Sequence, residues 1–218
     1  VVGRLLARGY AVRSLGRSPQ PALEAEGVTV YQGDLADYEQ VAKAAQGCGA
    51  VFHVAAKAGF WGDDAAYERV NVTGTQNVLH ACVEQKVRWL IYTSTPSVVF
   101  SGEPFRGADE RLPYGKNHLC AYSRTKAQAE QAVLAAHRPG ELDAVALRPH
   151  LIWGEGDPHL LPRVVDRVKR GRLRIVGDGK NRVDITHVEN AAAAHLNALD
   201  ALQGGQGGGR AYFISQGE

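Results

Sequence analysis

The segment RWLIYTST, residues 88–95, decides the fold of this chain. Its apolar residues run almost without interruption, and three hydroxyl residues, Thr93, Ser94 and Thr95, follow at its end. Such a run is typical of a strand in a parallel sheet that helices cover on both faces, because the strand then has no side turned to solvent. We therefore predict a buried strand here, with hydroxyl groups at its carboxyl end.

Comparable apolar runs recur along the chain and alternate with stretches of helical spacing. Alternation of strand and helix is the pattern of an α/β protein, so we predict a doubly wound parallel sheet. The expected strands are residues 11–15, 28–32, 50–56, 88–95, 143–149 and 211–215. The expected helices are residues 21–26, 37–46, 64–85, 122–137 and 187–202.

The pattern loosens after Arg148, where prolines become frequent and a basic helix is expected at residues 163–174. We therefore expect two domains. Residues 1–148 form the main sheet domain, and residues 149–218 form mainly a smaller region that faces the substrate and returns some elements to the sheet.

Composition narrows the class of protein. The chain has 218 residues, 44% of them hydrophobic, and a formal net charge of +2, so we expect a sizeable core and no nucleic acid partner. No apolar run is long enough to span a membrane and no secretory leader is visible, so we expect a cytoplasmic protein. The cysteines Cys48, Cys82 and Cys120 lie far apart and no histidines have metal-binding spacing, so we expect neither a disulfide framework nor a metal site.

Residues at the ends of the expected strands are candidates for a binding site, because open parallel sheets bind ligands at the carboxyl ends of their strands. Asp34 follows the strand at residues 28–32 and can either bind the amino group of an adenine or order the turn into the next helix. Ala55 and Ala56 end the next strand, and their small side chains let a flat ligand approach the backbone closely. Both interpretations of Asp34 remain open at this point.

The segment CAYSRTKAQAE, residues 120–130, places Tyr122 one helical turn before Lys126 on the same face of an expected helix. A neighbouring ammonium group favours the phenolate form and lowers a phenol pKa from its usual value of about 10. The pair can therefore transfer a proton, but the same residues also occur at an ordinary solvated helix start. The segment alone leaves both interpretations open.

Several segments in a fixed order carry a resemblance that covers the whole chain. They are VAAKAGFWG (54–62), NVTGTQNVL (71–79), IYTSTPSVV (91–99), the Tyr122/Lys126 pair, LRPHLIWGEGD (147–157) and VGDGKNRVDITHVENAAAAH (176–195). Together they resemble the extended short-chain dehydrogenases/reductases, in particular the 3β-hydroxysteroid dehydrogenase-like branch. Within it, the bacterial 2-alkyl-3-oxoalkanoate reductases are the most similar group. The resemblance implies a Rossmann-like fold, a small hydrophobic substrate and a possible homodimer through the helices at residues 64–85 and 122–137.

The resemblance also implies an oxidoreductase that interconverts a ketone and a secondary alcohol on a 3-oxo or 3-hydroxy substrate. Tyr122 would exchange the proton, Lys126 would support it and reach a ribose hydroxyl, and Thr95, in preference to Ser94, would orient the substrate oxygen. Asn71 would tie the backbone near the active site. The implied cofactor-binding residues are Arg17, Asp34, Leu35, Ala55, Ala56, Lys57, Asn71, Thr93, Tyr122, Lys126, Pro149 and His150.

The end of the strand at residues 11–15 indicates which nicotinamide cofactor is bound. Gly16 stands where NAD-dependent enzymes of this type carry a carboxylate for the ribose 2′-hydroxyl, and Arg17 follows it. An arginine accommodates a 2′-phosphate, so we favour NADP(H) over NAD(H). Arg17 as an ordinary loop charge is the alternative.

The pyrophosphate of a dinucleotide rests on a Gly-rich loop between the first strand and the first helix. The first residues here, VVGRLLARG, instead read as the second half of a helix that ends at Gly9. We therefore expect the first strand and this loop to be missing, the chain to be truncated at both ends, and its affinity for cofactor to be weak.

Two other functions remain open. A sugar-nucleotide epimerase or dehydratase shares the fold, the tyrosine and the lysine, while a non-catalytic nucleotide-binding protein shares the fold but needs no proton donor. Three cations, Arg163, Arg172 and Arg182, would suit the diphosphate of a sugar nucleotide. The residues that favour an acyl or sterol pocket are Phe105, Leu112, Leu119, Trp153, Leu160 and Leu161.

Overall fold

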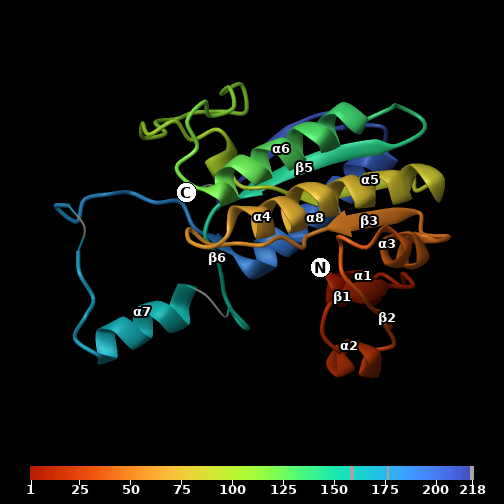
Figure 1. Ribbon diagram of the computed structural model, residues 1–218, viewed down its shortest axis with the longest axis horizontal. Helices are drawn as coiled ribbons and strands as arrows, with labels where there is room; N and C mark the ends of the chain where they lie inside the picture. The colour runs from red at the N-terminus through yellow and green to blue at the C-terminus, as the bar shows by residue number, and fades with distance from the viewer. Residues whose placement is uncertain (158–159, 176, 217–218) are drawn as a thin grey trace.

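The computed structural model describes residues 1–157, 160–175 and 177–216, in which helices alternate with strands (Figure 1). The strands are β1 (Arg13–Gly16), β2 (Thr29–Gln32), β3 (Ala50–His53), β4 (Trp89–Thr93), β5 (Asp143–Pro149), β6 (Ile152–Trp153), β7 (Thr186–His187) and β8 (Ala211–Ile214). The α-helices are α1 (Val2–Ala7), α2 (Pro21–Ala25), α3 (Tyr38–Ala45), α4 (Asp64–Tyr67), α5 (Gly74–Glu84), α6 (Ala121–Ala136), α7 (Leu160–Lys169) and α8 (Val188–Gln203). The predicted α/β class is confirmed.

All pairs of these strands are parallel. The main sheet has the order β3-β4-β5-β8, with Trp89 of β4 lying beside Ala50 of β3 and Asp143 of β5. Strands β1 and β2 form a separate pair, as do β6 and β7. The sheet is therefore divided between β1 and β3, which share no backbone hydrogen bonds within the described part of the chain.

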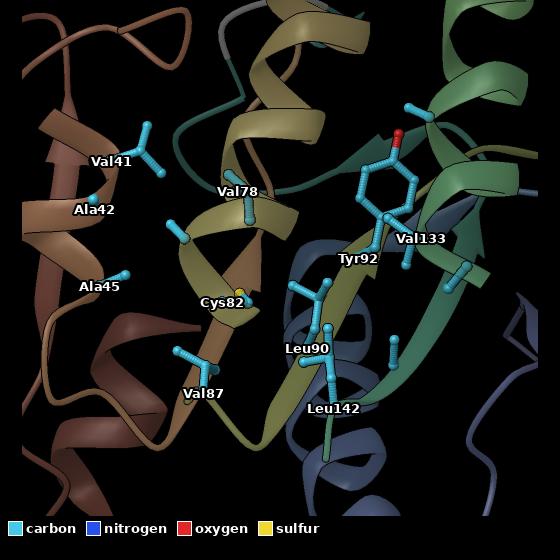
Figure 2. Close-up of a cluster of buried hydrophobic side chains, with 14 residues drawn as sticks. Val41, Ala42, Ala45, Val78, Cys82, Val87, Leu90, Tyr92, Val133 and Leu142 are labelled. Atoms are coloured by element: carbon cyan, nitrogen blue, oxygen red, sulfur yellow. The ribbon is translucent and has the colours of Figure 1, made fainter. Parts of the chain in front are cut away.

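Successive side chains of the central strand enter two hydrophobic clusters on opposite faces of the main sheet. Leu90 and Tyr92 lie in a cluster with α3, α5 and α6, where Cys82 and Val133 are also buried (Figure 2). Ile91 lies in a second cluster with α1 and α8. Because neighbouring residues of a strand point to opposite faces, helices cover both sides of this sheet, as a doubly wound fold requires.

The helix predicted over residues 64–85 is interrupted. It begins as α4, widens into a π-helical turn at Glu68–Thr73 and continues as α5. Apolar periodicity does not reveal one wide turn, because the helix resumes immediately after it. Several boundaries also differ from the prediction: β1 starts at Arg13, β3 ends at His53, and α7 covers Leu160–Lys169 and ends before Gly171, whose φ is 63°. Ala55 and Ala56 therefore lie in the loop after β3 and do not end the strand.

Some elements after Arg148 pack against the main sheet or extend it, and one helix lies away from it. Helix α8 contacts β4 and β5, and β8 extends the main sheet beside β5. Helix α7 instead stands apart from the sheet (Figure 1). Within residues 1–157, 160–175 and 177–216, no helix is long and apolar enough to cross a membrane.

Candidate active site

A cavity of about 430 Å³ lies where β1, β2 and β3 end. Pockets for small ligands occupy roughly 300–1,000 Å³, so its size suits part of a cofactor. The remaining wall comes from α4 and the π-helical turn and includes Arg69 and Val70, which sequence reasoning missed. Predicted cofactor-binding residues that line it are Arg17, Asp34, Leu35, Ala55, Ala56 and Lys57.

Asp34 orders its turn and also faces the cavity. The backbone N–H of Ala36 donates to Asp34 Oδ1 at 2.9 Å, and Arg69 Nη2 donates to Asp34 Oδ2 at 2.8 Å. These contacts, the Ala36 hydrogen bond first, hold the pKa of the Asp34 carboxyl below its usual value. The two interpretations left open by the sequence are therefore compatible, because each carboxylate oxygen has a second lone pair.

The cavity residues fit the adenosine half of a dinucleotide. Ala55 and Ala56 allow a flat ring to approach the backbone, Gly16 leaves the end of β1 without a carboxylate, and Arg17 beside it supplies a positive charge. Arg69 supplies a second cation at the cavity wall, although Asp34 already neutralises part of its charge.

Asn71 connects this cavity to helix α6. The backbone N–H of Lys57 donates to Asn71 Oδ1 at 2.7 Å, and Asn71 Nδ2 donates to the carbonyl oxygen of Lys57 at 3.1 Å and to Thr125 Oγ1 at 3.0 Å. Asn71 is buried in the π-helical turn, where an unpaired amide would be costly. The segment after β3 is thus fixed to the helix that carries Tyr122 and Lys126.

Tyr122 lies in the first turn of α6 and interacts with Thr95. Burial raises the pKa of the Tyr122 phenol above its usual value, and a hydrogen bond with the Thr95 side chain partly opposes that rise. A neutral phenol at neutral pH is the proton-donating form. The structure thus differs from the sequence expectation, which was a lowered Tyr122 pKa.

The reason for this difference lies in where the Lys126 amine points. Lys126 is 2% exposed, its Nζ donates to the carbonyl oxygen of Thr93 at 2.6 Å, and it lies 4.1 Å from the centre of the Tyr92 ring. Burial lowers the Lys126 pKa to about 7, which the charge of Glu130 partly offsets. The amine therefore contacts the end of β4, and among the described residues it forms no hydrogen bond with the Tyr122 phenol.

Other predicted residues lie outside the cavity. The Thr93 hydroxyl is 2.6 Å from His195 Nε2, and His195 Nδ1 is 2.7 Å from the carbonyl oxygen of Ala191, so Thr93 is already engaged on both its hydroxyl and its carbonyl. Pro149 ends β5 beside Ile214 of β8, and His150 follows it.

The apolar residues expected to form an acyl or sterol pocket are not gathered in one place. Leu112 packs against the cluster around Val98, while Phe105 meets Phe100 edge to face. Leu119 is 76% exposed. Trp153 and Leu161 lie elsewhere, Trp153 against His187, and the side chain of Leu160 is outside the described residues. Arg163, Arg172 and Arg182 are exposed.

Comparison with known proteins identifies a matching family and similar proteins within it. Residues 8–218 match the 3-beta hydroxysteroid dehydrogenase/isomerase family. A 2-alkyl-3-oxoalkanoate reductase of Stenotrophomonas maltophilia (strain K279a) is 50% identical over 218 residues, covering 98% of this chain and 66% of the reductase. The bovine (Bos taurus) sterol-4-alpha-carboxylate 3-dehydrogenase, decarboxylating, is 38% identical over 221 residues, covering all of this chain and 62% of the dehydrogenase.

A solved structure shares the fold. MoeE5 in complex with UDP-glucuronic acid and NAD has a TM-score of 0.83 and 29% sequence identity, and the match covers all of this chain and 72% of MoeE5. The chain thus spans about two thirds of the length of the proteins it resembles.

Proposed function

Since the chain belongs to the 3-beta hydroxysteroid dehydrogenase/isomerase family, we propose that it serves an oxidoreductase that reduces the ketone of a hydrophobic 3-oxo substrate. The 50% identity to a 2-alkyl-3-oxoalkanoate reductase makes a 2-alkyl-3-oxoalkanoate the first substrate class to consider. A 3β-hydroxysteroid-like substrate is the second, through the sterol dehydrogenase.

The interaction of Tyr122 with Thr95, one helical turn from the buried amine of Lys126, is the observation that carries this proposal. Tyr122 holds its proton at neutral pH because burial raises its pKa, so it donates that proton to the ketone oxygen. Thr95 orients the same oxygen by a hydrogen bond. Lys126, whose amine is bound to the carbonyl oxygen of Thr93 and has a pKa of about 7, would support the reaction through a ribose hydroxyl of the cofactor rather than by direct contact with the phenol.

The cavity at the ends of β1, β2 and β3 would hold the adenosine half of the cofactor. When bound, the nicotinamide supplies the hydride. NADP(H) is favoured because Arg17, rather than a carboxylate, follows Gly16 at the cavity wall and would face a 2′-phosphate. Residues 1–148 would serve mainly the cofactor and residues 149–218 mainly the substrate.

The test measures oxidation of NADPH and of NADH by the protein with a 2-alkyl-3-oxoalkanoic acid, a 3-oxosteroid and a UDP-sugar. We expect reduction of the first substrate with a preference for NADPH. In Tyr122→Phe, which keeps the ring, we expect kcat to fall by about 10²- to 10⁴-fold, the usual contribution of general acid–base catalysis. Full activity in this variant would overturn the mechanism.

The same assay separates the rival functions. Turnover of the UDP-sugar in place of the oxo acid would identify an epimerase or dehydratase. Cofactor binding without turnover of any substrate would indicate a protein that only binds nucleotide.

A further inference from the structure

The loop between β3 and α4 carries two adjacent aromatic side chains that are largely exposed. Phe60 exposes 78% of its surface and Trp61 exposes 92%. Each is a large apolar group, and aromatic side chains of this size are usually buried in a core or at a contact. The exposed pair is therefore a candidate contact surface, and its function depends on where its loop lies relative to the candidate site.

The loop is seated on Tyr67 at both ends. Gly59 and Gly62 have φ angles of 129° and 143°, which residues with side chains rarely adopt. A Cβ atom at Gly59 would lie 3.1 Å from the Tyr67 hydroxyl, and one at Gly62 would lie 3.4 Å from the Tyr67 ring. The hydroxyl of the buried Tyr67 also donates to the carbonyl oxygen of Trp61 at 3.1 Å. The loop thus has a fixed base while its aromatic side chains stay in solvent.

Both ends of the loop lie at the wall of the candidate site. Lys57 before it and Asp63 after it both line the cavity. The backbone of Lys57 is held by Asn71, whose amide also bonds Thr125 of α6. The loop is therefore positioned by the same contacts that join the cavity to the catalytic helix.

Tyr67 brings the base of the loop near the reacting group. Burial is the main cause of the raised Tyr122 pKa, and the Tyr67 phenol adds to that rise. The Lys57 amine lies 5.0 Å from the centre of the Tyr67 ring. The aromatic pair is thus carried by a loop that rests on Tyr67 and whose two ends lie at the cavity wall.

We propose that residues 59–62 present Phe60 and Trp61 as the contact for the alkyl chain of the substrate. This inference rests on the proposed function. A 2-alkyl-3-oxoalkanoate has its ketone within a few bonds of its apolar chains, so a chain that leaves Tyr122 toward this loop meets the two rings. Both rings are uncharged, which suits a hydrocarbon and offers little to a diphosphate. The pair then sets the preference for long chains.

The first test compares two 2-alkyl-3-oxoalkanoic acids that differ only in alkyl length, methyl against dodecyl. In the double variant Phe60→Ser/Trp61→Ser we expect kcat/KM for the dodecyl substrate to fall about tenfold or more, because two large apolar contacts are lost. For the methyl substrate we expect a change within about twofold. Val83→Ser, which alters a 65% exposed apolar residue of α5 away from the site, is the matched control and should keep the wild-type ratio.

A second variant tests whether the position of the two rings matters, and not only their chemical nature. Gly59→Ala keeps both rings but cannot hold a φ of 129° without strain and brings its Cβ within 3.1 Å of the Tyr67 hydroxyl. We expect it to lower the ratio of dodecyl to methyl activity in the same direction as the double variant. An unchanged ratio would mean that the loop geometry is irrelevant to the substrate.

A binding measurement gives a readout that needs no turnover. On addition of the 2-dodecyl-3-hydroxy product, the fluorescence of Trp61 should shift to shorter wavelength as the indole leaves water, and the shift should be absent in Trp61→Phe. Trp89 and Trp153 remain in both proteins as a constant background.

The outcomes separate this inference from the proposed function. If the unaltered protein reduces both acids but the double variant keeps their activity ratio, the inference fails while the proposed function stands. If the double variant changes only the sedimentation of the protein, the pair joins two copies and the inference fails as well. If no oxo acid is reduced, both fail together.

Discussion

At the scale of single residues, His53 keeps an ionisable ring in the interior. Its Nε2 lies 2.9 Å from Thr75 Oγ1, and Thr75 in turn donates its hydroxyl proton to the carbonyl oxygen of Asn71 at 2.6 Å. His53 Nε2 must therefore be the donor to Thr75, which fixes the neutral tautomer. Burial, with the nearby charge of Lys126, lowers the His53 pKa to about 3.

This residue makes the stability of the protein sensitive to mild acid. Between the folded pKa of about 3 and the unfolded value of about 6.5, the unfolded chain binds the extra proton, so the free energy of unfolding decreases as pH falls through that window. From pH 6.5 to pH 5 the loss is about 2 kcal/mol. In His53→Gln we expect this part of the loss to disappear in urea unfolding curves recorded at pH 7 and pH 5. His80→Gln, at an exposed position, should follow the wild-type slope; equal slopes in all three proteins would refute the assignment.

At the scale of elements, the start of α5 approaches the turn after β2 very closely. Gly74 is in a helical conformation, with φ of −59°, so helix propensity alone predicts that Gly74→Ala is stabilising by roughly 1 kcal/mol. A Cβ there would lie only 2.9 Å from Leu35 Cβ. We therefore expect close packing to outweigh helix propensity and to make Gly74→Ala destabilising.

We expect Gly74→Ala to lower the free energy of unfolding by about 1–3 kcal/mol, the range typical of overpacking. Because Leu35 lines the cofactor cavity, the affinity for NADPH should fall as well. Gly3→Ala in α1, where no atom lies within 4 Å of the added Cβ, is the control and should be neutral or stabilising in thermal unfolding. If Gly74→Ala proved more stable than the unaltered protein, the prediction would be wrong, because α5 and Leu35 would then have moved apart at little cost in free energy.

Local patterns predicted the longer strands and helices but not the π-helical turn, the short strands β6 and β7, or the contacts between elements. The apolar run at residues 88–95 predicted β4, and the i to i+4 spacing placed Tyr122 and Lys126 on one face of α6. Arg69 was missed because its partner Asp34 is distant in sequence, and such a contact leaves no trace in periodicity. The direction of the Tyr122 pKa was missed for a similar reason, since burial depends on how the elements pack.

At the scale of the whole molecule, a buried ion pair joins parts of the fold that are far apart in sequence. Arg148 of β5 is 3% exposed and contacts Glu130 of α6, which is fully buried, through two hydrogen bonds of 3.0 and 2.5 Å. The Tyr114 hydroxyl, from the loop before α6, donates to the same carboxylate at 2.8 Å. The Arg148 guanidinium also lies 5.3 Å from the centre of the Phe213 ring in β8.

Removing one partner leaves an uncompensated charge in the interior. We expect Arg148→Met to lower the free energy of unfolding by about 3–5 kcal/mol, and the double variant Glu130→Leu/Arg148→Met to recover much of that loss. Arg8→Ala, which breaks the exposed pair between Arg8 and Asp200, should cost at most about 1 kcal/mol. Denaturant unfolding of these three variants, of Glu130→Leu and of the unaltered protein measures this; additive effects at Glu130 and Arg148 would contradict it.

The position of β5 has a consequence for the synthesis of this protein on the ribosome. Every residue of β5 is buried, and the strand lies between β4, which is made before it, and β8, which is made much later. From the moment β5 emerges until Ala211 pairs with Ala146, the growing chain displays an apolar strand with one open edge. Open edges of this kind recruit other chains, so this interval is when the nascent protein most needs a chaperone.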